Sequence, residues 1–418
     1  MNTINNILSS LIAIFIGTLP QLATSQQLTQ EQAANTVQLN TITTAVPFLM
    51  IAPDSRSGAL GDAGVALSAD ANCMHWNPAK MAFNENDLDV SLSYAPWLRA
   101  LVDDMNLAYL TAIDKLNKRQ AIGYALRYFS LGNITFTDEV GTTIRDFQPA
   151  ELSLDVGFSQ KFTEKFSGGV TGKFIHSNLT GGISVLGAES KPGISVAADV
   201  GVFYTNKFAN WFGGKGTFNW GMNISNIGSK MSYTETAQRD FIPTNLRLGT
   251  CYKLRVDDYN SLSFTFDLNK LLVPTQPVLD EFNAGNIASG YDPNVGVATG
   301  MIQSFYDAPG VVTFNPDSSS FTVEDGSVFK EELREINIGG GLEYEFQDVF
   351  AFRTGYFYEH YSKGNRQFVT LGAGIKYTVF AIDLSYLIST TQQNPLANTL
   401  RFTLRMQFSD IQEALSED

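Results

Sequence analysis

Runs of alternating polar and apolar residues recur between Leu88 and Phe408. In the stretch 151–159 (ELSLDVGFS), every second residue is apolar and the residues between are small or polar. The same alternation is found at 218–225, 262–268, 380–388 and 400–408. Because successive side chains of a strand point to opposite faces, this pattern predicts β-strands with one apolar and one polar face.

The length of these runs decides which kind of β-protein they form. Strands of soluble proteins usually have about five or six residues. The runs here have nine to thirteen, which is the length needed to cross a bilayer at a tilt of roughly 45°. A closed barrel pairs every backbone group, so a strand-rich chain can reside in lipid. We therefore predict an all-β, antiparallel transmembrane β-barrel.

Fourteen segments fit this pattern, an even number as in single-chain bacterial barrels. They are 88–97, 105–114, 120–131, 150–162, 166–179, 193–206, 216–227, 244–255, 260–271, 335–347, 349–360, 366–378, 380–390 and 399–408. With a periplasmic N-terminus, the odd-numbered connections should be the longer extracellular loops and the even-numbered ones short turns. The observed gaps follow this asymmetry, and the longest is 272–334.

For the last predicted strand, 399–408, alternation predicts which residues face lipid and which face the lumen. Leu400, Phe402, Leu404, Met406 and Phe408 should face lipid, whereas the residues between them should face the lumen. We expect an arginine at Leu404 to be costly and a change at Thr403 to be tolerated. The polar register of the barrel as a whole also contains charged residues: Asp155, Asp267, Asp383, Arg247, Arg401 and Arg405. These charges either hold a segment inside the lumen, which we favour, or line a conduction path.

Composition excludes several classes of protein. Carboxylates outnumber Lys plus Arg by 42 to 28, which argues against nucleic-acid binding because a phosphate-binding surface needs a basic field. Only 17% of residues are charged and 44% are apolar, which argues against intrinsic disorder. The two cysteines, Cys73 and Cys251, exclude a disulfide scaffold, although a single bridge between them stays open.

The sequence shows no catalytic, cofactor-binding or metal-binding constellation. His75, His176 and His360 are scattered and are interpreted as structural residues. The Gly-x-Gly pairs lie within strands, so they do not indicate a phosphate loop. Acidic residues in 280–332 lack the periodicity of a calcium loop. We expect no enzyme activity and no cofactor.

The N-terminal part divides into two pieces. Residues 1–25 carry no charged side chain and contain a short apolar core, which indicates a cleaved signal peptide rather than a membrane helix. Residues 26–87 are small, apolar and without alternation. We predict that they form a plug inside the lumen of the barrel 88–408, with 409–418 as an acidic periplasmic tail.

Two blocks of sequence resemble a known family. Asn-Pro-Ala at 77–79 ahead of fourteen strands is similar to FadL-type fatty-acid-transporter barrels. The longer stretch GDAGVALSADANCMHWNPAKMAF (61–83), with SFYDAPG (304–310), FKEELREI (329–336), RTGYFYEH (353–360) and GNRQFVTLGAGIKY (364–377), resembles the PorV-type barrels of the type IX secretion system in Bacteroidetes. The chain departs from that pattern at residues 311–328, which intervene before the acidic block.

The resemblance implies a Gram-negative outer-membrane protein that handles secreted cargo. PorV-type barrels bind the C-terminal signal domain of cargo, receive it from a large translocon barrel of the SprA/Sov type, and deliver it to a PorU-type peptidase for attachment to surface lipopolysaccharide. The alternative is a FadL-type transporter of hydrophobic small molecules, but the inward register of the strands is polar.

The longest loop supplies the candidate binding residues. Exposed aromatic side chains are the usual anchors of protein interfaces. The candidate cargo-binding or partner-binding residues are Phe282, Tyr291, Phe305, Tyr306, Phe314 and Phe321, with neighbouring loops at 132–149 and 228–243. Trp76, Asn77 and Pro78 are expected to be structural residues of the plug.

Overall fold

The computed structural model describes most of the chain. The described residues are 39–98, 104–137, 140–182, 184–185, 188–209, 215–234, 239–283, 285–315, 318–390 and 399–409. The expected signal peptide, the start of the expected plug and the acidic tail from residue 410 onward lie outside them. No helix among the described residues is both long enough and apolar enough to cross a membrane.

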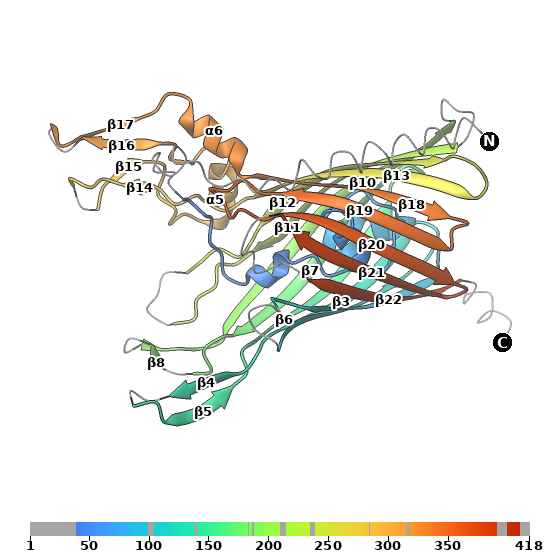
Figure 1. Cartoon of the computed structure of the whole chain (residues 1–418), viewed down its shortest axis with the longest axis horizontal. Helices are drawn as coiled ribbons and strands as arrows, with labels where there is room; N and C mark the ends of the chain where they lie inside the picture. The colour runs from blue at the N-terminus through green and yellow to red at the C-terminus, as the bar shows by residue number, and fades with distance from the viewer. Residues whose placement is uncertain are drawn as a thin grey trace.

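The described residues form a closed barrel of fourteen antiparallel strands (Figure 1). In order around the wall the strands are β1 (Leu88–Pro96), β2 (Met105–Asp114), β3 (Gln120–Leu131), β6 (Ala150–Lys161), β7 (Phe166–Asn178), β10 (Gly193–Ala209), β11 (Lys215–Gly228), β12 (Asn245–Arg255), β13 (Asn260–Leu271), β18 (Ile336–Phe346), β19 (Phe350–Tyr358), β20 (Gln367–Tyr377), β21 (Phe380–Ser389) and β22 (Leu400–Phe408). Each boundary lies within three residues of the sequence prediction, so the predicted strand count and order are confirmed.

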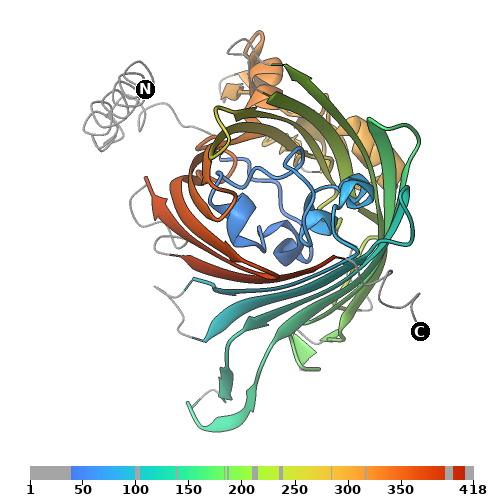
Figure 2. The ribbon, with the colours of Figure 1, turned by 90° about the vertical axis from the view of Figure 1, so that its right-hand side faces the viewer.

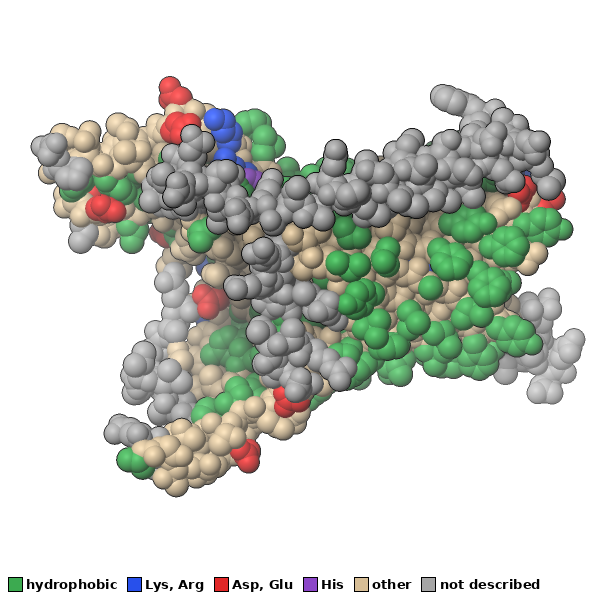
Figure 3. Space-filling view, in the orientation of Figure 1, with side chains coloured by type: hydrophobic (Ala, Val, Ile, Leu, Met, Phe, Trp, Pro, Cys, Tyr) green, Lys and Arg blue, Asp and Glu red, His purple; other side chains and the backbone are tan. Residues whose placement is uncertain are grey.

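The first half of the closing strand shows the predicted alternation: Leu400 and Phe402 are 37% and 42% exposed, whereas Arg401 is 2% exposed. Leu404 lies opposite Leu92 on β1 and Ile382 on β21. Leu92 and Ile382 are 48% and 49% exposed, whereas the neighbouring Thr403 is 1% exposed. Figure 3 shows the resulting hydrophobic face on the outer wall over the later strands.

Short elements extend the chain beyond one end of the barrel, which we call the long-loop end (Figure 1). They are the strands β4 (Ile134–Thr137), β5 (Thr143–Phe147), β8 (Ser184–Val185), β9 (Ala188–Glu189), β14 (Val278–Leu279), β15 (Ile287–Ser289), β16 (Val312–Asn315) and β17 (Ser320–Val323), and the helices α5 (Val297–Gln303) and α6 (Ser327–Arg334). The opposite, short-turn end carries the turns 115–119, 162–165 and 256–259.

The N-terminal segment, residues 39–87, occupies the interior of the barrel (Figure 2). Its helices are short: η1 (Pro47–Met50), α3 (Ser55–Gly58), α4 (Cys73–Trp76) and η2 (Pro78–Phe83). Glycines on the wall make room for it. A Cβ at Gly355 would clash with the backbone of Leu60 and Gly61, so this close approach of segment and wall requires glycine.

Ion pairs and charge-assisted hydrogen bonds join the N-terminal segment to the wall. Arg56 contacts Glu343 at 2.9 Å, and Asp62 contacts Arg401 at 3.3 Å. The carboxylate of Asp267 accepts hydrogen bonds from the backbone N–H of Gly64 and of Val65. These contacts agree with the interpretation that charged lumen residues hold a segment of the chain inside the barrel.

The direction in which this segment crosses the barrel corrects one expectation. The Asn40 N–H donates to the carbonyl of Ser362 at the long-loop end, and the Asp87 N–H donates to the carbonyl of Phe408 at the short-turn end. The chain therefore descends through the barrel before β1 begins, and residue 39 does not lie at the periplasmic side from which we had started the count. The assignment of odd-numbered connections to long loops and even-numbered ones to short turns still holds, because β1 itself starts at the short-turn end.

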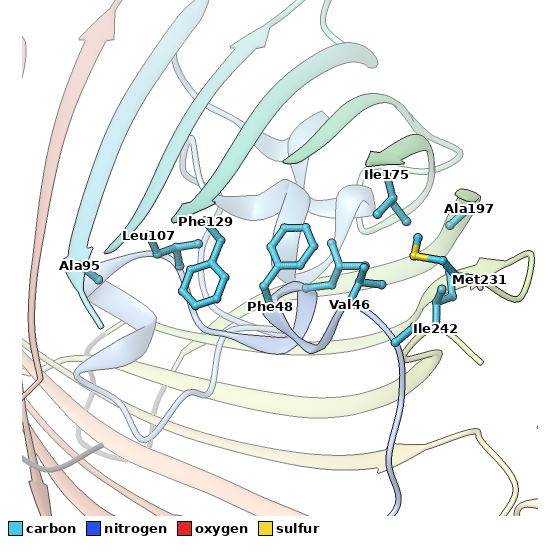
Figure 4. Close-up of a cluster of buried hydrophobic side chains, with 11 residues drawn as sticks. Val46, Phe48, Ala95, Leu107, Phe129, Ile175, Ala197, Met231 and Ile242 are labelled. Carbon is cyan, nitrogen blue, oxygen red and sulfur yellow. The ribbon is translucent and has the colours of Figure 1, made fainter. Parts of the chain in front are cut away.

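An apolar layer explains why the segment begins at the long-loop end. Val46 and Phe48 contact wall residues from several strands, including Leu107 and Phe129, and the loop residue Ile242 (Figure 4). The Phe48 and Phe129 rings stack with centroids 6.3 Å apart. Burial of these side chains fixes the upper part of the segment in the mouth of the barrel.

Candidate functional site

The long loop, residues 272–335, connects β13 to β18 and is a folded structure. The ribbons β14–β15 and β16–β17 and the helices α5 and α6 lie within it. Sequence patterns did not identify these elements, because strands of two to four residues carry too little alternation to be recognised.

Buried ion pairs hold the two ends of the long loop together. Lys270 is the penultimate residue of β13, and its Nζ lies 2.7 Å from Glu335 and 3.1 Å from Glu332. Lys363, from the neighbouring loop after β19, pairs with Glu335 at 3.0 Å and with Glu331 at 2.6 Å. We call these five residues the loop anchor.

The loop anchor also fixes the backbone of the loop interior. The Ala308 N–H donates to Glu332, and the Gly310 N–H donates to Glu331. The Thr275 hydroxyl donates to Glu335 at 2.7 Å. The carboxylates of α6 therefore hold the turn around residues 308–310 in place, and the loop presents a defined surface. The FKEELREI motif in the sequence contains these glutamates, but their lysine partners are distant in sequence and had not been identified.

One carboxyl group beside the anchor has a strongly perturbed pKa. Burial raises the pKa of Asp307 to about 7; the Thr275 N–H donated to it works in the opposite direction, and the nearby charges of Glu335 and Glu332 raise it further. Burial likewise raises the pKa of Glu332. The loop therefore contains one carboxyl group, Asp307, with a pKa near neutral, and a second, Glu332, whose pKa is raised.

The six candidate aromatic residues form two clusters and one separate position. Phe314 contacts both Phe282, at a centroid distance of 5.9 Å, and Phe321, at 6.2 Å. Tyr291 contacts Tyr306 at 5.6 Å.

The separate ring is that of Phe305, which lies 5.8 Å from the Lys270 Nζ and is 51% exposed. Tyr291 and Tyr306 are exposed to a similar degree, 51% and 50%. Half of each of these three rings is thus available on the outer surface of the loop.

The loop 132–149 flanks the mouth of the barrel on the side away from the long loop (Figure 1). Its ribbon β4–β5 exposes Ile134, Val140 and Ile144. The loop 228–243 lies against the N-terminal segment, since the Ala45 N–H donates to the carbonyl of Phe241. The Phe241 ring also packs against Gly300 of the long loop, so these two loops are continuous, whereas the loop 132–149 lies on the other side of the mouth.

Trp76, Asn77 and Pro78 lie inside the barrel, buried in the N-terminal segment. The Trp76 Nε1 donates to Asp54 at 2.6 Å. The Asn77 side chain donates to the carbonyl of Val202 on β10 at 2.9 Å and accepts from the Ala79 N–H at 3.0 Å. Asn77 thus caps η2, with Pro78 at its first turn, and fixes the segment to the wall.

Cys73 and His75 are buried in the N-terminal segment, and Cys251 is buried on β12 of the wall. Cys73 and Cys251 are both free thiols, so no disulfide bridge joins them. His75 lies between Arg127, 2.7 Å from its Nδ1, and Arg247, which donates to its carbonyl at 2.9 Å. Within the described ranges, no group of three His, Cys, Asp or Glu side chains is placed to hold a metal ion.

A closed barrel with a lipid-facing apolar wall and a polar interior filled by its own N-terminal segment defines an outer-membrane β-barrel of the transport or secretion type. Residues 33–278, more than half of the chain, match the family model described as Type IX secretion system protein PorV. The chain belongs to this family and is an outer-membrane component of that secretion system.

Solved structures similar to this chain are transport barrels at low identity. The toluene transporter TodX of Pseudomonas putida is 11% identical, with a TM-score of 0.45, over 85% of this chain and 98% of that chain. The toluene transporter TbuX of Ralstonia pickettii is 10% identical, with a TM-score of 0.43 over the same shares. A FadL homologue of Pseudomonas aeruginosa is 13% identical, with a TM-score of 0.38, over 88% and 99%. No curated protein matches the chain.

Proposed function

We propose that this barrel holds secreted cargo at the cell surface by the cargo's C-terminal signal domain. It would receive the cargo from a translocon barrel of the SprA/Sov type and pass it to a PorU-type peptidase for attachment to lipopolysaccharide. Family membership supports the secretion role. The observation that carries the binding surface is the long loop, whose exposed Tyr291, Phe305 and Tyr306 stand on a buried, ion-paired base.

The loop suits binding because it is already ordered. Ordering a loop on binding costs free energy, so a preformed surface retains more of its contact energy as affinity. Half-exposed aromatic rings are also the side chains that most often dominate interface energies. The same rings would be a solubility liability without a partner.

The alternative, passage of hydrophobic small molecules from the lumen into the membrane, receives less support. The inward side chains of the wall include Arg247, Asp267 and Arg401, and the N-terminal segment covers them. Around the wall, β10 pairs with β7 and β11 with one register shift, between Ala198 and Val200. A lateral exit through this continuous wall would require strands to separate.

Point substitutions test the proposal better than removal of the loop. Deleting residues 285–325 would abolish cargo binding on our proposal. It would also remove the backbone N–H groups of Ala308 and Gly310 that donate to Glu332 and Glu331, and so disturb the loop anchor. Replacing Tyr291, Phe305 and Tyr306 by alanine keeps the anchor. We expect the triple variant to remain a heat-modifiable barrel and to co-purify less than a tenth of the parental amount of cargo.

A matched control is Phe329→Ala, since Phe329 is a 68% exposed aromatic residue on α6 of the same loop and is not among the six candidate rings. It should retain cargo. Parental co-purification by the triple alanine variant would place the cargo site elsewhere.

A further inference from the structure

The short-turn end of the barrel, which in single-chain outer-membrane barrels lies on the periplasmic side, contains a cavity of about 1620 Å³. Its wall comes from the lower halves of the strands, and its floor includes Phe83 and Phe203 at the end of the N-terminal segment. The proposed cargo surface is at the opposite end of the molecule, so this cavity is a separate feature.

The cavity is basic although the whole chain carries a net charge of −14. Eleven Lys or Arg side chains line it, against six Asp or Glu. The acidic residues are mostly neutralised by internal pairs. Glu343 pairs with Arg56 and Arg353, and Glu345 pairs with Lys253. Asp383 and Asp348 are paired as well.

The surplus positive charge is concentrated on one arc of four lysines, which the two remaining acidic lining residues, Glu85 and Glu164, only partly offset. Lys161, Lys165, Lys207 and Lys215 line the cavity from β6, the β6–β7 turn, β10 and β11. Among the described residues, none of these lysines lies within ion-pair distance of a carboxylate. The strands β6, β7, β10 and β11 are consecutive in the wall, so the arc spans about three interstrand spacings, roughly 15 Å.

The arc has an apolar floor. The Lys161 Nζ lies 4.5 Å from the centroid of the Phe83 ring, and Phe83 contacts Phe203 at a centroid distance of 5.5 Å. Phe208, which stacks on Tyr252, also lines the cavity. Phe83 and Phe208 are partly exposed, whereas Phe203 is buried beneath Phe83. Unpaired cations next to partly exposed rings fit a ligand with both negative charges and apolar groups.

We propose that this periplasmic mouth is a docking site for an acidic polypeptide segment presented by a second protein. The cavity is larger than the roughly 300–1,000 Å³ typical of small-molecule sites. Its lysines are spread over several strands, which suits a row of carboxylates better than a single phosphate. Lipid headgroups meet the outer wall, where Phe162, Tyr377 and Phe380 are exposed at this end, whereas the lysines face the cavity.

Fluorescence anisotropy with the full mature protein in detergent tests this proposal. The probe is a labelled synthetic peptide of alternating glutamate and leucine, and the control probe is the same peptide with lysine in place of glutamate. We expect only the acidic peptide to bind, with an affinity that falls as salt is raised. Equal binding of both peptides, or binding that is insensitive to salt, would overturn the proposal.

Variants locate the site. Replacing Lys161, Lys207 and Lys215 together by glutamine should weaken binding by at least about tenfold, a loss of about 1.4 kcal/mol. Lys118→Gln is the matched control, because Lys118 is an exposed lysine of the β2–β3 turn at the same end and is not a lining residue. Unchanged affinity in the triple variant would overturn the assignment. Heat-modifiability on gels shows whether each variant assembles into a barrel. If the triple variant does not assemble, the salt dependence of peptide binding by the parental protein still tests the proposal.

The acidic residues of the chain itself must be distinguished from a partner. Ser409, at the end of β22, hydrogen-bonds to the cavity residue Asn86 at 3.1 Å, and residues 410–418 include Asp410, Glu413, Glu417 and Asp418. Deleting 410–418 should leave the peptide affinity within about twofold. If the acidic peptide binds only after this deletion, residues 410–418 of the chain itself are the occupant of the cavity instead of a second protein. Alanine at Tyr291, Phe305 and Tyr306 should not affect peptide binding. The proposal for the basic cavity can therefore hold even if the proposal for cargo binding by the long loop fails.

Discussion

Lys270 and Glu335 stand at the two ends of the long loop and meet in a buried ion pair 2.7 Å long. The residue after Glu335, Ile336, is the register partner of Lys270 in the β13–β18 pairing. The pair therefore closes the loop where it leaves and re-enters the barrel wall. Its burial means that removing one partner leaves a charge without compensation.

Removing Lys270 should loosen the long loop without unfolding the barrel. Lys270→Ala should raise hydrogen exchange across α6, with a loss of local stability of about 3 kcal/mol, the low end of the range for breaking a buried pair, because Lys363 also contacts Glu335. Arg255→Ala is the control: its ion pair with Asp348 is exposed and should be worth less than about 1 kcal/mol. Equal exchange of α6 in the two variants would show that the anchor does not hold the loop.

The long loop should become less firmly closed as the pH rises towards 7, because of Asp307. The pKa of Asp307 is about 7 in the folded loop, against an ordinary value of 3.8. The folded loop therefore binds this proton more tightly than the opened loop does. The contribution of Asp307 to the closed state is fully present below about pH 4 and is lost as the pH rises towards 7. A spin label on Phe321→Cys should gain mobility between pH 5 and pH 7, the part of this window in which the glutamates of the loop anchor keep their ion pairs.

Asp307→Asn isolates the cause of this pH dependence. Asparagine keeps a side-chain acceptor for the Thr275 N–H but does not titrate. The label should then report a smaller pH response, with Glu332 as the remaining group of raised pKa. An undiminished response in this variant would assign the effect to other groups.

The closing strand should distinguish lipid-facing from lumen-facing positions. Leu404→Arg places a charge in the lipid and should cost about 2–4 kcal/mol near the bilayer centre. Thr403 is not the freely replaceable lumen residue that alternation suggested. Its hydroxyl accepts from the Ser55 N–H at 2.9 Å and contacts the Ser93 hydroxyl at 2.9 Å. Thr403→Ala should cost about 1–3 kcal/mol, and Thr403→Ser should cost less in urea unfolding from lipid vesicles.

Thr403 illustrates what the sequence could and could not predict. Strand positions follow from alternation within each run, so all fourteen were predictable from local sequence. The Thr403–Ser55 contact joins residues 348 positions apart, and no local pattern contains it. The same holds for the loop anchor, since Lys270 and Lys363 flank the acidic motif at a distance. The aromatic candidates were found from composition, but their division into two clusters depends on the loop fold.

The N-terminal segment should block conduction through the barrel. Planar bilayers should show negligible conductance for the mature protein and a large increase when residues 26–87 are deleted. Asn77→Ala should give intermediate, flickering conductance, because it removes the hydrogen bond to Val202 and the cap of η2, the cap alone being worth about 1 kcal/mol. Asn117→Ala, in an exposed turn, is the control. A steady open conductance in the intact protein would contradict a closed lumen.

The path of the N-terminal segment predicts that its beginning is accessible from outside the cell. Leu39 is 73% exposed, and its neighbour Asn40 donates to the carbonyls of Ser362 and Gln276 at the long-loop end. Single-chain outer-membrane barrels place their long loops outside and their short turns in the periplasm. A membrane-impermeant maleimide should therefore label Leu39→Cys on intact cells. The native cysteines are buried and should contribute little background.

The control for this labelling is a cysteine at the other end of the barrel. Asn117 lies in the β2–β3 turn at the short-turn end and is exposed, so Asn117→Cys should react only after the outer membrane is permeabilised. The two positions together test orientation and path. If both react only after permeabilisation, residue 39 lies in the periplasm and the segment does not cross the barrel as described. If Asn117→Cys alone reacts on intact cells, the barrel is inverted, and the basic mouth rather than the long loop faces the exterior.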